Sequence, residues 1–514
     1  MALPRASERA AEAAESWSVP PGTARRALLV YTGLALILRL FRLGHQSLWM
    51  DEVLSATNAD HPWRSLLFDP AVDRNFPPLY NLVVHGVQQW LGRGDTLLRF
   101  PSAVAGVLSV PLFFLAVRRW VGDRLALTGA LLLAISPLHV WYSQEARPYA
   151  LLLLFALATL WCAARSLREP HRVRWLVGFT AAAAATFYTH LIAIPFLGVI
   201  GGHLLLRTPP RHRLRAVGAL AALALLALPQ LLRFAGAPPT LSGNSDYQFQ
   251  LSHLGYTGWA FMAGFSLGPS LLELRGGMPA VRPYLSEIVP VMLLTAALFL
   301  LGARLLWREQ REACLVLAGW MVAVGGFAVA GAVLSSHPYN VRYVILALPP
   351  FLLITAAGVH AVRSTPVRVT AATVWGSIAA ISLGNYYAAP KYSREDNRAA
   401  VAFLNDHAAP GDLVVATAPY TALALRYYGL RDDLELLPYP ASGLVAEGQP
   451  ARELGPATGD RRRVWLFASR EFHSDPGGRI GGFLGTRYRA ADRFRAAGVR
   501  VVRYQRPAPG ASSP

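Results

Sequence analysis

Two adjacent acids, Asp51 and Glu52, lie in the segment HQSLWMDEVLS, directly after the first long apolar block of the chain. Two carboxylates at a membrane boundary repel each other and lose hydration, so such a pair is costly unless it has a function. One of them could take the proton from an acceptor hydroxyl or amine, close to a lipid-borne substrate. Alternatively, both acids are solvated loop residues or cap a helix that begins near Val53.

A second group of candidates lies in the polar interruption of SPLHVWYSQEARPYALLLL, between two apolar blocks. Arg147 offers a planar donor fork, which suits a phosphate group when it faces a cavity. Tyr149 adds an aromatic surface against which a sugar ring can lie. Glu145 could line the same cavity, or it could simply pair with Arg147.

A third group opens a later apolar block, in SSHPYNVRYVILALPPFLLI. Arg342 lies there beside Tyr343, with His337 and Tyr339 just before it. A cation at this depth can meet a lipid phosphate at headgroup level. The alternative is an arginine that extends to the membrane surface only as an anchor.

Weaker candidates come from two further segments. Asp73 and Asn75 lie in DRNFPPLYNLV and could line the same cavity, although a purely structural turn explains them equally well. His190 lies in FYTHLIAIP, at a turn between two apolar blocks. A lone histidine is more often a structural residue than a base or a ligand, so we expect it only to line the cavity.

The elements that must position these residues are membrane spans. The 514 residues are 54% hydrophobic and only 15% charged, whereas a soluble protein carries about a quarter charged residues. The apolar residues gather in blocks near the length of a bilayer span, at 27–43, 101–117, 124–141, 148–164, 174–189, 191–206, 215–234, 286–306, 313–334, 343–361 and 368–386. A shorter amphipathic block, 77–92, predicts a helix in the membrane interface.

The net charge of +19 could indicate nucleic acid as a partner. The excess is almost all arginine in short clusters between apolar blocks, however, and such clusters determine membrane topology. The clusters are Arg25-Arg26, Arg118-Arg119-Arg124, 165–174, 207–215, 304–311 and 362–368. If 77–92 is not counted as a span, every cluster falls on one side. We therefore expect eleven spans in the cell membrane, a cytoplasmic N-terminus, and candidate residues on the extracytoplasmic face, with no nucleic-acid partner.

The predicted fold class is an all-α polytopic membrane protein with a small C-terminal extracytoplasmic α/β domain. Residues 1–26 form a flexible cytoplasmic tail, 27–388 the transmembrane domain with outer loops 44–100 and 235–285, and 389–514 the last domain with a disordered end. In this domain LVVAT, RRVWLFAS and VRVVRYQ have the composition of strands. The chain has no phosphate-binding loop, dinucleotide fingerprint or metalloprotease motif, and its two cysteines fit no metal spacing.

The order of these motifs resembles a known class. HQSLWMDEVLS, FPPLY, SPLHVWYSQEARPYALLL, FYTHL, GFSLGPSLLELR and VRYVILALPP follow one another as in bacterial integral-membrane glycosyltransferases of the GT-C class, which are related to protein O-mannosyltransferases and to the lipid A aminoarabinose transferase. The resemblance covers about residues 27 to 388. It implies a polyprenyl-phosphate-linked sugar donor and transfer of a hexosyl or pentosyl group to an extracytoplasmic protein, lipid or glycan.

The resemblance also implies roles for individual residues. Asp51 matches the catalytic base, with Glu52 beside it. Arg342 and Tyr343 match the start of a late helix near the donor phosphate, and the segment of Glu145 and Arg147 matches one that lines the cavity. Some relatives carry an acid and a lysine before the Pro-Pro pair, where this chain has Asn75 and Phe76. We therefore expect no cofactor and no required metal, although a divalent ion stays compatible with the acids.

Two alternatives belong to other classes. A carrier or flippase of lipid-linked sugars would place charged residues near the middle of several spans. Here the spans are nearly free of charge away from their ends, apart from Arg39 and Arg233, and the acids gather at one face. A polysaccharide polymerase or ligase of the outer leaflet would share basic outer loops, but it would not need the Asp-Glu pair after the first span.

Overall fold

The computed structural model describes residues 17–73, 76–235, 249–334, 338–459 and 461–507. The chain divides into two compact units. The first contains Met1–Leu43 and His61–Tyr392, and the second contains Gly44–Asp60 and Ser393–Pro514. The segment of the Asp-Glu pair is thus grouped with the C-terminal residues, although the sequence places it in the first outer loop.

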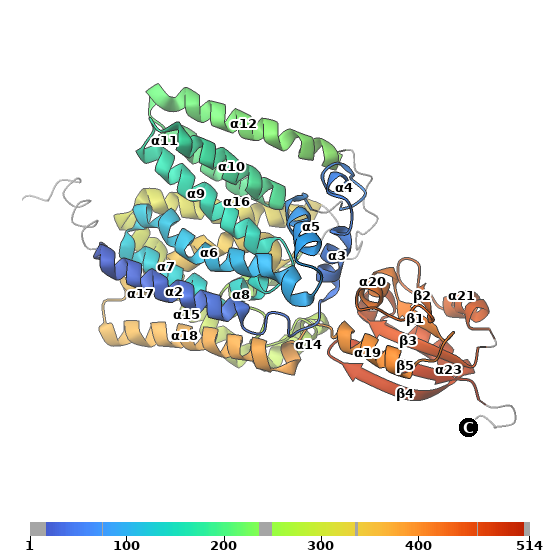
Figure 1. The fold of residues 1–514 in the computed structure, drawn as a ribbon. Coiled ribbons are helices and arrows are strands. Elements are labelled where there is room, and N and C mark those ends of the chain that lie inside the picture. The colour runs from blue at the N-terminus through green and yellow to red at the C-terminus, as the bar shows by residue number, and fades with distance from the viewer. Residues whose placement is uncertain (1–16, 74–75, 236–248, 335–337, 460, 508–514) are drawn as a thin grey trace, which may run out of the picture. The chain divides into compact units, whose positions relative to one another are not determined.

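The first unit is helical, and its longest helices run side by side in Figure 1. Its α-helices are α2 (Pro21–Leu40), α4 (Trp63–Phe68), α5 (Leu79–Trp90), α6 (Asp95–Val121), α7 (Asp123–Ile135), α8 (Pro137–Ser143), α9 (Tyr149–Arg168), α10 (Val173–Thr189), α11 (Ala193–Arg207), α12 (Pro210–Ala235), α13 (Ser252–Ala263), α14 (Met278–Val281), α15 (Leu285–Glu309), α16 (Arg311–Leu334), α17 (Leu348–Ala361) and α18 (Thr365–Ala388). Short 3₁₀ turns are η1 (Glu273–Gly276), η2 (Arg282–Tyr284), η3 (Val341–Ala347) and η4 (Pro390–Tyr392).

The polytopic helical architecture is confirmed. Within the described residues, 7 helices are long and apolar enough to cross a membrane, or 8 if α7 and α8, bent by 57°, form one span. Each expected apolar block is helical, but α2, α10 and α11 are not among these candidate spans, so the count of eleven spans stays a prediction. The first helix begins at Pro21 rather than at 27, because proline suits the first turn of a helix. The expected helix in 77–92 is α5.

Helices α15 and α17 pack with their backbones in contact, at Gly302 and Gly358. A methyl group at Gly302 would overlap the carbonyl oxygen of Ile354, and one at Gly358 would overlap that of Leu298. Small residues allow such close approach of helices in membranes, where packing rather than water exclusion drives association.

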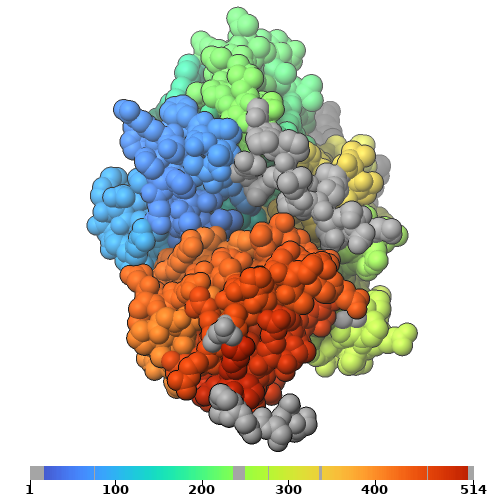
Figure 2. Space-filling model, turned by 90° about the vertical axis from the view of Figure 1, so that its right-hand side faces the viewer, coloured from blue at the N-terminus to red at the C-terminus, as the bar shows by residue number. Residues whose placement is uncertain are grey.

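The second unit is a small α/β domain around one five-stranded sheet, whose strands are labelled in Figure 1. The surface of its C-terminal residues is orange to red in Figure 2. Its strands are β1 (Leu413–Thr417), β2 (Glu435–Tyr439), β3 (Arg463–Ser469), β4 (Arg489–Ala496) and β5 (Val499–Gln505), in the order β2-β1-β3-β5-β4. Strand β1 pairs in parallel with β2 and β3, while β5 is antiparallel to β3 and β4. The three expected strands are β1, β3 and β5; the sequence did not indicate β2 and β4.

Helices cover both faces of this sheet. They are α19 (Asn397–His407) and α20 (Pro419–Tyr427) on one face, and α21 (Gln449–Thr458) and α23 (Arg479–Arg487) on the other. The unit also contains α3 (Met50–Asn58) and α22 (Glu471–Ser474). Successive side chains of a strand point to opposite faces. Val414 accordingly packs with residues of α19 and α20, and Val415 with residues of α21 and α23. The domain therefore has two apolar cores, and α3 contacts α20.

Candidate functional site

Four segments of the first unit contribute to one cluster around His190. They are the residues before α5, the turn between α8 and α9, the turn between α10 and α11, and η3. The Phe76 ring lies edge-on to the His190 ring, with centroids 4.9 Å apart. Arg147 lies over the same Phe76 ring, with its guanidinium carbon 4.5 Å from the ring centroid. Segments separated by more than a hundred residues thus form one cationic and aromatic site.

The His190 ring is held between tyrosines. Its centroid lies 5.8 Å from that of Tyr149 and 6.1 Å from that of Tyr343. The Ile192 amide donates to His190 Nδ1 at 3.2 Å, so the proton of the neutral ring belongs on Nε2. Nε2 is buried and has no hydrogen-bond partner among the described residues. The histidine therefore offers one free N–H donor to the cluster.

The charge state of His190 follows from its surroundings. Burial, followed by the electrostatic effect of Arg147 and Arg342, lowers the pKa of His190 to about 3. The imidazole is therefore neutral near pH 7, and the two guanidinium groups supply the positive charge. A neutral donor between two cations suits an anionic ligand better than it suits proton transfer.

Arg342 lies at the start of η3, as expected for an arginine that opens the α17 block. Its amide donates to the side-chain oxygen of Asn340 at 3.1 Å, which caps the turn. Its guanidinium lies 5.3 Å from the Tyr343 ring centre and donates to the Tyr343 hydroxyl at 3.5 Å. The side chain is partly exposed, so it remains accessible to a ligand.

The turn between α8 and α9 holds its polar residues inside the first unit. Glu145, Arg147 and Tyr149 are 1%, 4% and 0% exposed. The Arg147 amide donates to the Glu145 carbonyl at 2.7 Å, and the Ser102 hydroxyl donates to the Arg147 carbonyl at 3.2 Å. These bonds fix the backbone of the turn. The fixed backbone in turn sets the direction of the Arg147 side chain.

Asp73 shapes the turn before the Pro-Pro pair. Its carboxylate accepts from the Phe76 amide at 3.2 Å and from the Asn81 side chain at 2.8 Å, and its carbonyl accepts from Arg233 at 3.1 Å. These bonds favour a structural role for Asp73, which holds the turn that positions Phe76. Asn75 and His337, also expected to line the cavity, lie outside the described residues.

Asp51 and Glu52 belong to the second unit, in the first turn of α3. Asp51 is partly exposed, whereas Glu52 is 0% exposed and accepts from Arg394 Nη1 at 2.9 Å. A carboxylate that is buried and paired in this way is poorly suited to remove protons from a substrate. The structure therefore distinguishes two acids that the sequence could not.

Three residues of these sites escaped the sequence analysis as candidates. One feature of the sequence could have indicated Phe76, namely its position just before the Pro-Pro pair. Tyr142 packs on Tyr149 with ring centroids 4.9 Å apart, but it precedes the polar SQEARPY run. Arg394 carried no indication at all, because its partner Glu52 is 342 positions away in the chain.

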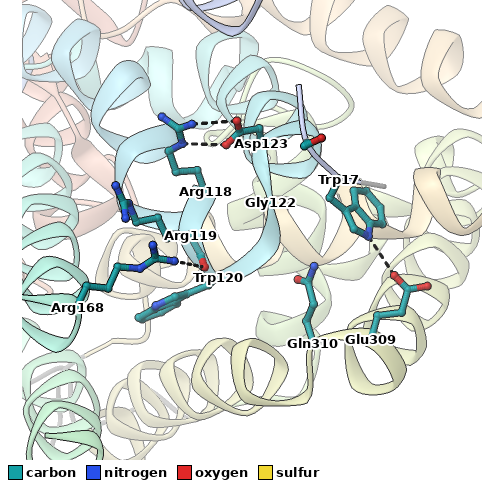
Figure 3. Close-up of a pocket in the computed structure, with 10 residues that line it drawn as sticks. Trp17, Arg118, Arg119, Trp120, Gly122, Asp123, Arg168, Glu309 and Gln310 are labelled. Atoms are coloured by element: carbon teal, nitrogen blue, oxygen red, sulfur yellow. Dashed lines mark hydrogen bonds and ion pairs between the residues drawn. The ribbon is translucent and has the colours of Figure 1, made fainter. Parts of the chain in front are cut away.

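A separate cavity of about 500 Å³ lies in the first unit (Figure 3). Its walls include Trp17, Arg119, Arg168 and Glu309, together with Arg118, which forms two hydrogen bonds to Asp123 at 2.8 and 2.9 Å. These arginines belong to the predicted topology clusters, and none of the expected site residues lines this cavity. Within the described part of the chain, no group of three or more His, Cys, Asp or Glu is placed to hold a metal ion.

Comparisons with known proteins support the resemblance. Residues 75–232 match the family model of dolichyl-phosphate-mannose-protein mannosyltransferases. No curated protein sequence matches the chain. Among solved structures, ArnT from Cupriavidus metallidurans in the apo state has a TM-score of 0.54 and 14% identity, with 94% of this chain and 98% of that chain covered. The same ArnT bound to undecaprenyl phosphate has a TM-score of 0.51 and 15% identity, with 92% and 97% covered.

Two larger proteins share the same fold. The Archaeoglobus fulgidus oligosaccharyltransferase has a TM-score of 0.50 and 12% identity, with 86% of this chain and 67% of that chain covered. The arabinofuranosyltransferase AftD from Mycobacteria has a TM-score of 0.50 and 14% identity, with 96% and 40% covered. The chain therefore has the fold of these membrane glycosyltransferases, and residues 75–232 are similar to the mannosyltransferase family model, as the motifs indicated.

Proposed function

We propose that this GT-C membrane protein transfers a sugar from a polyprenyl-phosphate-linked donor to an extracytoplasmic acceptor. The fold, the family match over residues 75–232 and the undecaprenyl phosphate bound to the similar ArnT all support this class of donor. We place the reaction at the outer face of the cell membrane, from the distribution of arginine clusters.

The observation that carries the proposal is the cluster around His190. It combines two guanidinium groups, a neutral N–H donor and the rings of Phe76, Tyr149 and Tyr343. Guanidinium groups bind phosphate oxygens through paired donors, and aromatic rings provide apolar surface for a sugar or a prenyl chain. An enzyme that takes its sugar from a water-soluble nucleotide-sugar would not need a buried cationic and aromatic site within a membrane protein.

In the proposed reaction the bond between the anomeric carbon and the phosphate oxygen breaks. The polyprenyl phosphate leaves with the electron pair of that bond, and Arg147 and Arg342 stabilise its additional negative charge. The acceptor oxygen or nitrogen forms the new bond to the anomeric carbon. Its proton passes to the carboxylate of Asp51, which acts as general base.

Tyr149, Tyr343 and His190 belong to the donor site in this proposal, and Glu145 and Asp73 lie in the segments that form it. Asp51 is the base because it is the accessible acid of the pair, while Glu52 is buried against Arg394. No metal-dependent step is required, since the leaving phosphate meets cationic side chains.

The test uses purified full-length protein in lipid nanodiscs with polyprenyl-phosphate sugars that carry a radiolabelled mannose, arabinose or aminoarabinose. We expect release of polyprenyl phosphate with one of these donors, faster when an acceptor fraction from the cell envelope is added. Asp51→Asn should lower the turnover by at least a hundredfold while donor binding persists. Equal turnover by wild type and Asp51→Asn would exclude Asp51 as the base.

A flippase would give a different outcome in the same system. In sealed vesicles it would move the intact lipid-linked sugar between leaflets, without release of polyprenyl phosphate and without dependence on an acceptor. A polymerase or ligase of the outer leaflet would release the lipid phosphate but would transfer a glycan of many sugars rather than one. The size of the transferred group therefore separates the last two activities.

A further inference from the structure

The segment of the Asp-Glu pair is bound into the C-terminal domain by its backbone. The Leu48 amide donates to the Tyr428 hydroxyl at 2.6 Å, and the Leu48 carbonyl accepts from the Asn397 side chain at 3.1 Å. Arg398 donates to the His45 carbonyl at 2.6 Å. Residues of α19 and Tyr428, which follows α20, thus hold the chain that leads into α3, although 349 and 380 positions separate Leu48 from Asn397 and Tyr428.

The strongest tie is the ion pair between Glu52 and Arg394. The two side chains are 0% and 4% exposed, and Arg394 Nη1 lies 2.9 Å from Glu52 Oε2. The Arg394 amide also donates to the Gln46 side chain at 3.2 Å. A charge pair removed from water is costly unless both partners stay together, so loss of either partner is strongly disruptive.

Glu52 also closes the first turn of α3. It is the third residue of the helix, and its carboxylate accepts from the Trp49 amide at 3.3 Å, which is the carboxylate half of a capping box. Trp49 in turn lies under Arg470 of the C-terminal domain, 5.8 Å from the guanidinium carbon to the ring centre. The helix start is therefore fixed both within α3 and to the domain.

The same contacts set the direction of Asp51. Adjacent residues of an α-helix point about 100° apart around its axis. Glu52 points into the domain and is fully buried, whereas Asp51, one position earlier on the helix, points in another direction and is partly exposed. The burial of Glu52 thus determines the direction in which the Asp51 side chain points.

We infer that the C-terminal α/β domain holds the catalytic helix α3, and that Glu52 and Arg394 are the positioning residues of the base Asp51. The inference rests on the proposed function for the role of Asp51, but the attachment of α3 to the domain does not. It assigns a function to the domain and to Glu52, for which the motifs indicated none.

The test compares full-length variants Glu52→Gln, Arg394→Gln and the double variant with a matched control, Arg461→Gln. Arg461 forms an ion pair with Glu435 in the same domain, and its side chain's other hydrogen bonds go to the Ala457 and Gly411 carbonyls rather than to residues 44–60. Hydrogen exchange by mass spectrometry measures the amides of residues 45–58. We expect exchange there to be at least tenfold faster in both single variants and unchanged in Arg461→Gln.

The kinetic readouts separate positioning from folding. Misplacement of a catalytic group by about 1 Å can cost about a hundredfold in rate. We therefore expect kcat to fall by about ten- to a hundredfold in Arg394→Gln, with KM for the donor within about twofold of wild type. The acidic limb of the kcat/KM profile should persist in this variant, since Asp51 is still the base, and disappear in Asp51→Asn.

The outcomes decide the two proposals separately. Unchanged exchange in residues 45–58 in both single variants would overturn the anchoring role, whatever the enzyme does. Faster exchange with kcat unchanged would overturn the positioning role. If wild type transfers no sugar, the exchange experiment still decides whether Glu52 and Arg394 hold α3. Should the single variants fail to fold, Arg398→Gln, which removes the hydrogen bonds to the Gly44 and His45 carbonyls, provides the same exchange comparison.

Discussion

Arg147 and Arg342 both act on His190 and supply the positive charge of its cluster. We expect Arg147→Gln and Arg342→Gln each to lower kcat by about a hundredfold, since removal of one donor to a developing oxyanion costs about 2.7–4 kcal/mol. Lysine keeps the charge but loses the planar fork, so Arg147→Lys and Arg342→Lys should recover only part of the rate. Steady-state kinetics with the lipid-linked donor measure both effects.

The matched control for these variants is Arg119→Gln. Arg119 lines the separate cavity in Figure 3 and is exposed. Its loss should leave kcat and KM within about twofold of wild type. An equal loss of activity in Arg119→Gln would show that total charge, rather than the cluster, controls the rate.

His190 gives a prediction about pH. Burial and the two neighbouring arginines lower its pKa to about 3, whereas a histidine in an unfolded chain has a pKa of about 6.5. Below pH 6.5 the unfolded chain takes up a proton that the folded protein does not bind. The folded state therefore loses stability as the pH falls from 6.5, by up to about 1.4 kcal/mol per pH unit.

The measurement is the thermal midpoint Tm in detergent at pH 7.5 and pH 5.5. We expect wild type to lose more Tm over this interval than His190→Asn, which has no imidazole to protonate. The pH dependence of kcat should have the same shape in both proteins between pH 6.5 and 8, because His190 stays neutral there. A loss of Tm that is identical in the two proteins would contradict the low pKa.

The site residues could be predicted from the sequence only in part. Arg147, Tyr149, Arg342 and Tyr343 were indicated because polar residues at the ends of apolar blocks are costly and therefore informative. His190 was expected only to line the cavity, because its single free N–H depends on a bond from the Ile192 amide. Local patterns contain no information about such bonds.

At the scale of elements, the α15–α17 contact gives a sharp prediction. An added methyl group at Gly302 or Gly358 would meet backbone atoms of the facing helix, which cannot move aside as a flexible side chain can. We expect Gly302→Ala and Gly358→Ala to lower Tm, since overpacking costs about 1–3 kcal/mol or more. Size-exclusion chromatography after heating measures the loss.

Two glycines of α16 serve as controls. Nothing lies within 4 Å of a methyl group at Gly325 or Gly326. Alanine there should be neutral, or should raise Tm because it favours helix over coil by up to about 1 kcal/mol. A decrease in Tm as large as that of Gly302→Ala would indicate general sensitivity of the helices instead of backbone contact.

The elements were largely predictable where one local pattern dominates. The run LVVAT forms β1 because it is apolar and β-branched and is buried on both faces. Strand β4, RAADRFRA, was missed because its residues alternate between exposed and half-buried and carry many charges. Strand β2 was missed because its proline weakens a strand pattern, a position that is tolerated at the edge of a sheet.

At the scale of the whole molecule, the grouping of residues 44–60 with the C-terminal domain could not be predicted. It depends on partners such as Glu52 and Arg394, which lie far apart in the chain and have no periodic pattern. Hydrophobic blocks and charge clusters, by contrast, are local features. The membrane architecture was therefore accessible from the sequence, while the attachment of α3 was not.

The orientation in the membrane is a prediction, and labelling of two introduced cysteines tests it. Cys162 and Cys314 are buried, so the native background of a membrane-impermeant maleimide should be low. His171 lies in a cluster predicted to be cytoplasmic and Glu447 in the C-terminal domain, and both are exposed. On intact cells we expect Glu447→Cys to react at once and His171→Cys to react only after permeabilisation. The reverse result would place Asp51 and the C-terminal domain in the cytoplasm, and an extracytoplasmic acceptor would then be excluded.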